Sequence, residues 1–341
     1  MPVENLPVPT TLVRWSQRLL KGLVLSLVAS LNTQAVNLIV GDQSYSARTV
    51  MERQSYSART VMEAAGVLKD LPYELEWKQF TAGSPVAEAL NVGSLDIGLL
   101  GDSPALFMGA LGAPIKVIGV SRQNLDGVAI VVRKDSPIKT VADLAGKKVA
   151  IWKGSFSQQL MLTALDKAGV ARDAVDYRYL SALDSSHALD GGSVDAIATW
   201  EPYVTQQEQQ GARIIATAEG LIPAQSFIVA NDLAIKDKRA QISDFLQRLQ
   251  AARAWSVSDP QHNERYANAW AALTKADAEV ARRWFSRAQV VVVPITAQVV
   301  AGAQQTIDFF NNAGLTKRYP AASVFDESFS AALADQAQAV R

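Results

Sequence analysis

Short apolar runs alternate with stretches of helical pattern along most of this 341-residue chain, and this alternation limits the fold more than any other feature. Strands are expected at 36–40, 73–80, 96–101 and 114–121, and a helical stretch follows each of the first three. Strands that alternate with helices predict a mostly parallel sheet with helices on both faces.

The same alternation restarts after an apolar stretch at 127–133 and ends near 225–231, beyond which the pattern is almost wholly helical. Two α/β units and a helical tail predict two lobes with a cleft between them. We expect the chain to cross between the lobes at these two stretches. Residues 36–132 would then begin lobe 1, residues 133–226 would form lobe 2, and residues 227–341 would complete lobe 1 and add the C-terminal helices. Ligands of open α/β sheets bind outside the carboxyl ends of the strands, so the loops there carry the functional prediction.

The N-terminus has the order of a secretory signal. Arg14, Arg18 and Lys21 precede an apolar run at 22–31 that is too short to span a bilayer, and small residues follow near position 35. This order predicts a signal peptide over residues 1–35 and export of the rest. A buried or interfacial helix is the alternative.

Composition excludes several classes of function. The chain has 33 basic and 33 acidic residues, and removal of residues 1–35 takes away three basic and one acidic residue, so no basic excess remains to bind nucleic acid. The absence of cysteine excludes disulfides, a cysteine nucleophile and thiolate metal sites. Two histidines far apart, His187 and His262, predict no histidine metal site. We therefore expect neither a metal nor another cofactor.

Four expected strand-to-helix junctions share one pattern, in which serine, glycine or proline precedes or begins a helix. They lie at 81–85, 101–104, 153–159 and 199–203. Serine is a strong N-cap, and proline suits the first helical position. Helix N-termini carry free N–H groups and the positive end of the macrodipole, so several that converge on one cleft predict an anion site that needs no Arg or Lys. Further donors are expected from the hydroxyls of Ser84, Ser103, Ser155 and Ser157. The alternative is that each serine merely caps its own helix.

Aromatic residues also occur in these loops. Phe156 and Trp200 are expected to line a groove for an alkyl or ring portion of the ligand. Trp200 has the alternative of completing the core of its strand. Glu201 is expected either to bind a cationic ligand group or to stabilise the helix that follows it.

The stretches QFTAGSPVAEALNVGSLDIGLLGDSPALF, SPIKTVADLAGKKVAIWKGSFSQQLMLTAL, VDAIATWEPY and QSFIVAN, in this order, resemble the periplasmic aliphatic-sulfonate-binding proteins. These belong to the wider nitrate, sulfonate and taurine group of transporter substrate-binding proteins. The resemblance covers roughly residues 36–330. It implies an α/β, two-lobed periplasmic-binding-protein fold, of type II-like topology, that closes on its ligand by a hinge motion. Carried over position by position, it implies these ligand-loop residues: Ala82, Gly83, Ser84, Gly101, Asp102, Ser103, Gly154, Ser155, Phe156, Ser157, Trp200, Glu201 and Pro202.

Two positions depart from the family pattern. Phe156 stands where a small polar residue is common, and Gln158 stands where relatives often carry histidine. Both departures bear on which ligand tail the site prefers, and a bulky phenylalanine is suited to stack on a ring.

A second unusual feature is a tandem repeat. Residues 43–53 read QSYSARTVMER, and residues 54–63 repeat the first ten of them. One continuous helix would be about 16 Å too long for the neighbouring strands. We therefore expect only the second copy to keep the helix packing, while the first projects near the cleft mouth. Because the family uses this junction as a ligand loop, either Gln43 with Ser44 or Gln54 with Ser55 is expected at the site.

The resemblance implies a carrier that is not an enzyme. It would capture an alkanesulfonate in the periplasm as a monomer and deliver it to an ABC permease in the inner membrane. Taurine, nitrate or another small anion is an alternative ligand. A thiamine-pyrimidine synthase or a desulfinase on the same scaffold is an alternative activity, although such enzymes depend on cysteine or histidine chemistry. A third alternative is a ligand-sensing module.

Overall fold

The computed structural model describes residues 36–42, 58–80, 83–274 and 277–337. The predicted signal peptide and the first copy of the repeat lie outside these ranges. Among the described helices, none combines the length and the apolar character that a membrane span requires.

The first sheet has six strands in the order β11-β4-β10-β3-β1-β2. Strands β1 to β4 run in one direction, while β10 and β11 run antiparallel to their neighbours. The strands are β1 (Asn37–Asp42), β2 (Glu74–Gln79), β3 (Ile97–Gly101), β4 (Ile115–Arg122), β10 (Ser226–Asn231) and β11 (Val291–Val293).

The second sheet has five strands in the order β7-β6-β8-β5-β9. All but β5 run in one direction. The strands are β5 (Val128–Val132), β6 (Lys148–Ile151), β7 (Asp176–Tyr179), β8 (Ala196–Trp200) and β9 (Arg213–Thr217). Both sheets are therefore mixed. The predicted parallel arrangement holds for strands joined through helices, whereas the strands at which the chain enters from the other sheet, β5 and β10, pair antiparallel.

We name the part of the chain around the first sheet lobe 1 and the part around the second sheet lobe 2. Strand β5 was expected in lobe 1, but it pairs with β8 and β9 and so belongs to lobe 2. The first crossing therefore lies between Arg122 and Val128 instead of after residue 132. The second lies between Thr217 and Ser226, close to the expected boundary. The apolar stretch 127–133 suits a buried strand in either sheet, and its pairing partners are not visible in the local pattern.

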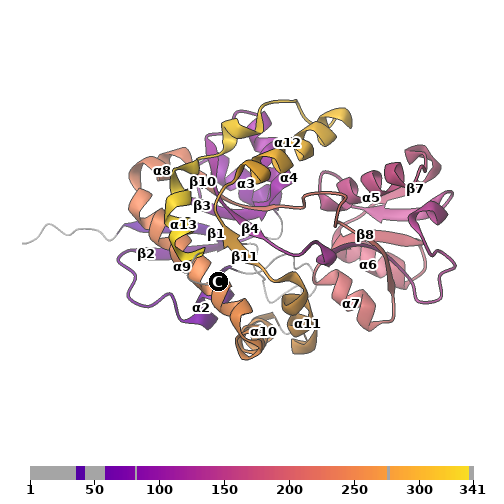
Figure 1. Cartoon of the computed structure of the whole chain (residues 1–341), viewed down its shortest axis with the longest axis horizontal. Helices are drawn as coiled ribbons and strands as arrows, with labels where there is room; N and C mark the ends of the chain where they lie inside the picture. The colour runs from indigo at the N-terminus through magenta and orange to yellow at the C-terminus, as the bar shows by residue number, and fades with distance from the viewer. Residues whose placement is uncertain (1–35, 43–57, 81–82, 275–276, 338–341) are drawn as a thin grey trace, which may run out of the picture. The chain divides into compact units, whose positions relative to one another are not determined.

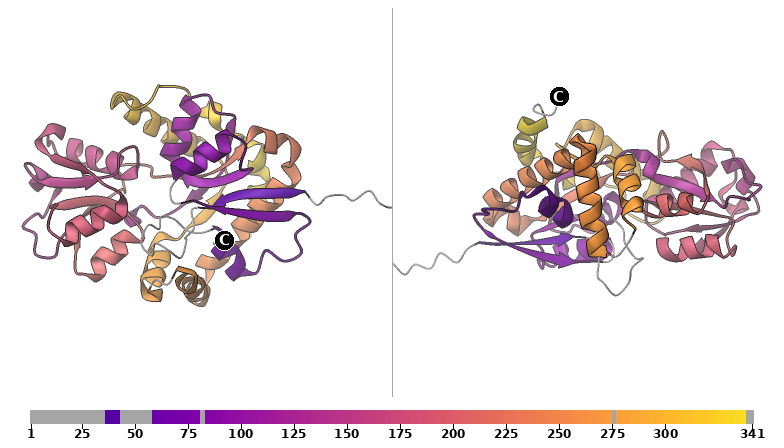
Figure 2. Two further views of the ribbon diagram at one scale, coloured as in Figure 1. Left: turned by 180° about the vertical axis from the view of Figure 1, so that it is seen from behind. Right: turned by 90° about the horizontal axis from the view of Figure 1, so that it is seen from below.

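Helices cover both faces of each sheet (Figure 1; Figure 2 shows the layers from behind and from below). One face of the first sheet packs against α2 (Ala58–Ala65), α9 (Arg239–Ser258), α10 (Pro260–Thr274), α11 (Ala278–Ala288) and α13 (Ser330–Ala337), and the other against α3 (Gly83–Asn91), α4 (Asp102–Ala110) and α12 (Ala297–Asn312). In lobe 2, α5 (Phe156–Lys167) covers one face, and α6 (Ala182–Asp190) and α7 (Tyr203–Gln209) cover the other. The shorter helices are α8 (Asp232–Asp237) and the 3₁₀ turns Leu125–Gly127, Val141–Leu144, Arg172–Ala174, Ala321–Val324 and Glu327–Phe329.

The central strands are buried on both sides. In β10, Phe227 and Val229 enter one core of lobe 1, while Ile228 and Ala230 enter the other. Successive side chains of a strand point to opposite faces, so a continuous apolar run marks a strand that is covered on both. This explains why 225–231 and 127–133 have no polar alternation.

The described part of the second copy, residues 58–63, lies in α2, as predicted, and the expectation that the first copy projects stays a prediction. Val61 and Met62 of this copy are fully buried in the core of lobe 1. The N–H of Arg59 donates to Asp42 Oδ2 at 3.1 Å, which ties the start of α2 to the end of β1.

Candidate ligand-binding site

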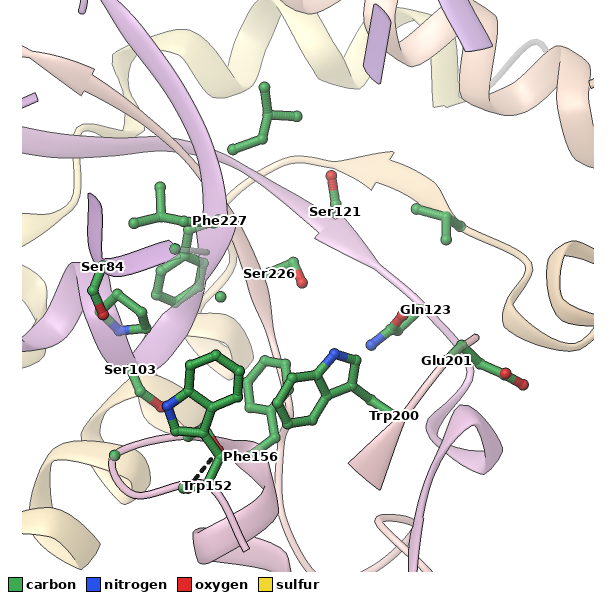
Figure 3. A pocket seen from close by; sticks show the side chains of 18 of the residues that line it. Ser84, Ser103, Ser121, Gln123, Trp152, Phe156, Trp200, Glu201, Ser226 and Phe227 are labelled. Atoms are coloured by element: carbon green, nitrogen blue, oxygen red, sulfur yellow. Dashed lines mark hydrogen bonds between the residues drawn. The ribbon is translucent and has the colours of Figure 1, made fainter. Parts of the chain in front are cut away.

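A cavity of about 150 Å³ lies between the two lobes at the carboxyl ends of their strands (Figure 3). Lobe 1 contributes the end of β3 and the starts of α3 and α4, and lobe 2 contributes the loops after β6 and β8. Nine of the residues proposed from the sequence line it: Gly83, Ser84, Gly101, Ser103, Gly154, Ser155, Phe156, Trp200 and Glu201.

The remaining proposed residues do not line the cavity or are not described. The ones outside the described residues are Gln43, Ser44, Gln54, Ser55 and Ala82. The other three, Asp102, Ser157 and Pro202, are buried behind the lining.

Asp102 and Ser157 support their neighbours and do not face a ligand. The Asp102 carboxylate accepts hydrogen bonds from Ser103 Oγ at 3.0 Å and Thr306 Oγ1 at 3.2 Å. Burial raises the pKa of Asp102 to about 6, although these hydrogen bonds act in the opposite direction. Ser157 Oγ donates to the Ala198 carbonyl at 2.6 Å and accepts from the Trp152 N–H at 3.1 Å. Asp102 and Ser157 therefore hold the starts of α4 and α5 in place.

Most of the serine hydroxyls at the helix starts already donate hydrogen bonds to other groups of the protein. Ser103 Oγ donates to Asp102, and Ser155 Oγ donates to the Trp152 carbonyl at 2.7 Å while it accepts from the Ser157 N–H at 3.2 Å. The structure thus corrects the expectation that Ser103, Ser155 and Ser157 supply hydroxyl donors. The first-turn N–H groups remain, since they have no acceptor within their own helix.

Two further serines, Ser121 and Ser226, line the cavity, although the sequence pattern did not indicate them. Ser226, at the start of β10, pairs in register with Ser121 of β4 on one side and Gly101 of β3 on the other. All three residues line the cavity, as does Gln123 just beyond β4. Neither serine immediately precedes a helix, so the pattern of serine before a helix does not include them. No local signal pairs two strands this far apart in the chain.

The lining also contains two cations, which the helix-start pattern did not indicate, and an anion site that needs no Arg or Lys stays a prediction. They are Lys153, in the loop after β6, and Arg253, on α9. Arg253 is only 2% exposed, and its Nη1 donates to Tyr266 Oη at 3.2 Å. The helical period of α9 indicates that Arg253 is buried, because it falls one turn after the buried Leu249.

Aromatic rings form one wall of the cavity. The ring centroids of Trp152 and Trp200 are 6.2 Å apart with planes 36° apart, and Phe156 meets Trp200 edge-on at 6.5 Å. Phe156 and Trp200 also pack against the core of lobe 2, as one interpretation of Trp200 expected, while contact of either ring with a ligand tail stays a prediction. Trp152 was missed because it lies one residue before the junction proposed at 153–159.

Glu201 lines the cavity, and its carboxylate accepts hydrogen bonds from other residues of the protein. Thr205 donates to it from N–H at 3.0 Å and from Oγ1 at 2.9 Å, and Arg287 Nη1 donates at 3.0 Å. In Figure 3 the carboxylate points away from the aromatic wall. Burial raises its pKa to about 7, against the lowering effect of Arg287 and Thr205. Of the two roles expected, stabilisation of the following helix fits these contacts, and pairing with a ligand cation does not.

Comparisons with known proteins agree with this architecture. The family described as NMT1/THI5 like matches residues 69–263. A protein of Escherichia coli described as an aliphatic sulfonates-binding protein is 36% identical over 70% of this chain and 74% of its own length. The crystal structure of the periplasmic aliphatic sulphonate binding protein SsuA from E. coli superimposes with a TM-score of 0.75 at 30% identity, over 86% of this chain and 92% of that one.

Two more solved structures extend the comparison. The alkanesulfonate-binding protein SsuA from Xanthomonas axonopodis pv. citri, bound to MOPS, has a TM-score of 0.73 and 28% identity, with coverage of 86% and 99%. A mutant of the desulfurization enzyme DszB, in complex with biphenyl-2-sulfinic acid, shares the fold at 16% identity, with a TM-score of 0.65 and coverage of 89% and 99%. The fold is therefore that of the SsuA-type binding proteins, and the chain belongs to the NMT1/THI5-like family.

Proposed function

We propose that this chain is the substrate-binding component of an ABC importer, exported to the periplasm, where it captures sulfonates between its lobes. One observation carries the proposal. In lobe 1, the starts of α3 and α4 lie beside the ends of β3 and β4 and the start of β10, and together they meet the start of α5 of lobe 2 at a single cavity. The names of the relatives support the ligand class and the compartment.

The donors around the cavity suit a sulfonate head group. A sulfonate stays singly anionic at physiological pH, so its oxygens need fixed donors instead of a titrating partner. First-turn N–H groups and the positive ends of three helix dipoles supply such donors. The hydroxyls of Ser84, Ser121 and Ser226 and the buried guanidinium of Arg253 add to them. Charge-assisted hydrogen bonds are roughly twice as strong as neutral ones.

Contacts from both lobes couple binding to closure. A ligand that touches both sides of the cavity binds a closed arrangement better than an open one, and it shifts the population toward closure by that difference in affinity. The closed form then presents a distinct surface to the permease.

Calorimetric titration of the chain from residue 36 onward tests the ligand class. We expect methanesulfonate and ethanesulfonate to bind at micromolar or tighter Kd, and sulfate and nitrate to bind at least tenfold more weakly. NMR of the recovered ligand is expected to show it unchanged, as a carrier requires and a desulfinase does not. A clear response to another anion class with none to any sulfonate would reject the proposal. Gel filtration is expected to show a monomer.

A cap substitution tests the helix-start chemistry. Ser155→Ala removes the N-cap of α5, and Ser181→Ala removes the equivalent cap of α6, which lies outside the cavity lining. Each should lower the free energy of unfolding by about 1 kcal/mol. Only Ser155→Ala should also weaken methanesulfonate, by about fivefold. Equal losses of affinity in both variants would mean that the start of α5 has no direct part in binding.

A further inference from the structure

We propose that the cavity selects sulfonates that carry a single aromatic ring over sulfonates with a linear alkyl or an ammonium-bearing tail. This inference rests on the proposed function and names its ligand class. It follows from the aromatic wall, from the charges of the lining and from the size of the cavity.

The aromatic wall, formed by Trp152, Phe156 and Trp200, is suited to pack against an aromatic ring of the ligand. A ligand ring does not fit between Trp152 and Trp200, because their centroids are only 6.2 Å apart and a sandwiched ring needs two carbon–carbon contacts of about 3.5 Å each. The ring must instead pack on the side of the wall that faces the cavity. There the Trp152 and Trp200 planes, tilted by 36°, and the edge-on Phe156 offer both faces and edges. Such offset and edge-to-face contacts contribute beyond the buried area, whereas an alkyl chain gains only the area.

The position of this wall is fixed by contact with lobe 1. A side chain at Gly101 would place its Cβ 3.3 Å from Phe156 Cζ, so the ring of Phe156 lies directly over the end of β3. The lobe 1 side of the lining also contains apolar residues beside its serines, namely Leu99, Leu100 and Phe227. A flat apolar group between these two sides would contact both lobes.

The charges of the lining disfavour a cationic tail. Among the described residues that line the cavity, the ionisable side chains are Lys153, Arg253 and Glu201. Glu201 is occupied by Thr205 and Arg287, so no carboxylate of the lining is left to pair with an ammonium group. Attraction of a cation to the tryptophan faces acts the other way, but it contributes about 0.5–2 kcal/mol and two lining cations oppose it.

The size of the cavity limits the tail to one ring. An engineered cavity of about 150 Å³ in another protein binds benzene, and the present cavity, which continues into the open space between the lobes, has a similar volume. A fused pair of rings would therefore require the lobes to open. Benzenesulfonate is the simplest molecule that meets all three conditions.

A matched series of ligands tests the proposal by calorimetry. The series comprises methanesulfonate, hexane-1-sulfonate, cyclohexanesulfonate, benzenesulfonate, 2-naphthalenesulfonate and taurine. We expect benzenesulfonate to bind about tenfold more tightly than hexane-1-sulfonate and about fivefold more tightly than cyclohexanesulfonate, which has the same size without π electrons. Taurine and 2-naphthalenesulfonate should bind at least tenfold more weakly than benzenesulfonate.

Substitutions then connect the preference to the wall. Trp152→Leu and Phe156→Leu should each lower the preference for benzenesulfonate over methanesulfonate by five- to tenfold. Trp255→Leu is the matched control, because Trp255 stacks on His262 and lies outside the cavity lining. It should change neither affinity.

The outcomes separate this inference from the proposed function. If no sulfonate binds, the proposed function fails and the inference fails with it. If methanesulfonate binds but hexane-1-sulfonate equals or exceeds benzenesulfonate, only the inference is overturned. It is also overturned if Trp152→Leu weakens every sulfonate equally, because the ring would then serve only to hold the loop.

Discussion

At the scale of single residues, Asp102 shows how a buried acid organises a helix start beside the cavity. It follows β3 directly, is fully buried, and accepts the hydroxyl hydrogens of Ser103 and Thr306. Its own N–H donates to the Gln225 carbonyl at 2.9 Å, just before β10. Asp102 thus connects α4, α12 and the residue before β10. Its substitution tests how much the buried charge lowers the free energy of unfolding.

Asp102→Asn should change how stability depends on pH. The folded-state pKa of about 6 exceeds the ordinary value of 3.8, so the folded state holds this proton more tightly than the unfolded state. The stabilisation is therefore complete below about pH 4 and is lost as pH rises to about 6. Asp102→Asn lacks this loss. Urea unfolding should therefore give the two proteins similar free energies of unfolding at pH 4, and a free energy of unfolding that is higher for the variant by up to about 3 kcal/mol at pH 7.

Asp143→Asn is the control of opposite sign. The backbone N–H groups of Lys139 and Thr140 hold the pKa of the exposed Asp143 below its ordinary value. Its stabilisation is present above the unfolded pKa and is lost as pH falls, so this variant should lose stability at neutral pH and resemble the wild type in acid. A pH-independent difference for Asp102→Asn would contradict the assignment.

At the scale of elements, local patterns predicted most of the strands and the helix starts beside the cavity, and nine of the proposed site residues line one cavity. Helix caps, apolar runs and turn residues act over a few positions, so the sequence shows them directly. The pairing of Ser121 with Ser226 depends on strand order, which no local pattern contains. The three-residue β11 and the strand β9 were missed because neither has a repeating signal long enough to detect.

Removal of the first copy of the repeat should leave the fold intact. Deletion of residues 43–53 keeps Asp42 followed by Gln-Ser-Tyr-Ser, and it shortens the connection to α2 from residues 43–57 to residues 54–57. Asp42 Oδ2 lies 3.1 Å from the Arg59 N–H, so four residues can span the gap. Loop-closure entropy then favours the deletion by about 1 kcal/mol. Urea unfolding and sulfonate titration check this, and a loss of stability above about 1 kcal/mol would show that the first copy packs on the protein.

At the scale of the whole described chain from Asn37 onward, two sets of contacts join the lobes on either side of the cavity. On one side, Gln159 of α5 donates to Thr306 of α12 at 3.4 Å. On the other, Arg287 of α11 donates to Glu201 at 3.0 Å and also to Glu208 of α7. The second set matters more for closure, because Glu201 belongs to a loop that lines the cavity and is only 4% exposed.

Arg287→Met should therefore destabilise the protein by an amount that grows with pH. Burial raises the pKa of Glu201 to about 7, and Arg287 is the main group that opposes the rise, so the substitution moves the pKa higher still. With a folded pKa above the ordinary 4.5, stability is lost as pH rises through that interval, and the variant should lose more of it. Near pH 5, Glu201 is protonated in both proteins, and the difference should be about 1 kcal/mol, from the loss of the partly exposed Glu208 pair. At pH 8.5 the variant must either bury an unpaired carboxylate or keep it protonated, at a cost of about 3 kcal/mol.

Urea unfolding at both pH values measures the two differences. Arg282→Met, which removes an exposed pair with Glu279 on the same helix, should cost less than about 1 kcal/mol at either pH. Equal losses for Arg287→Met at both pH values would show that the Glu201 contact does not join the lobes in solution.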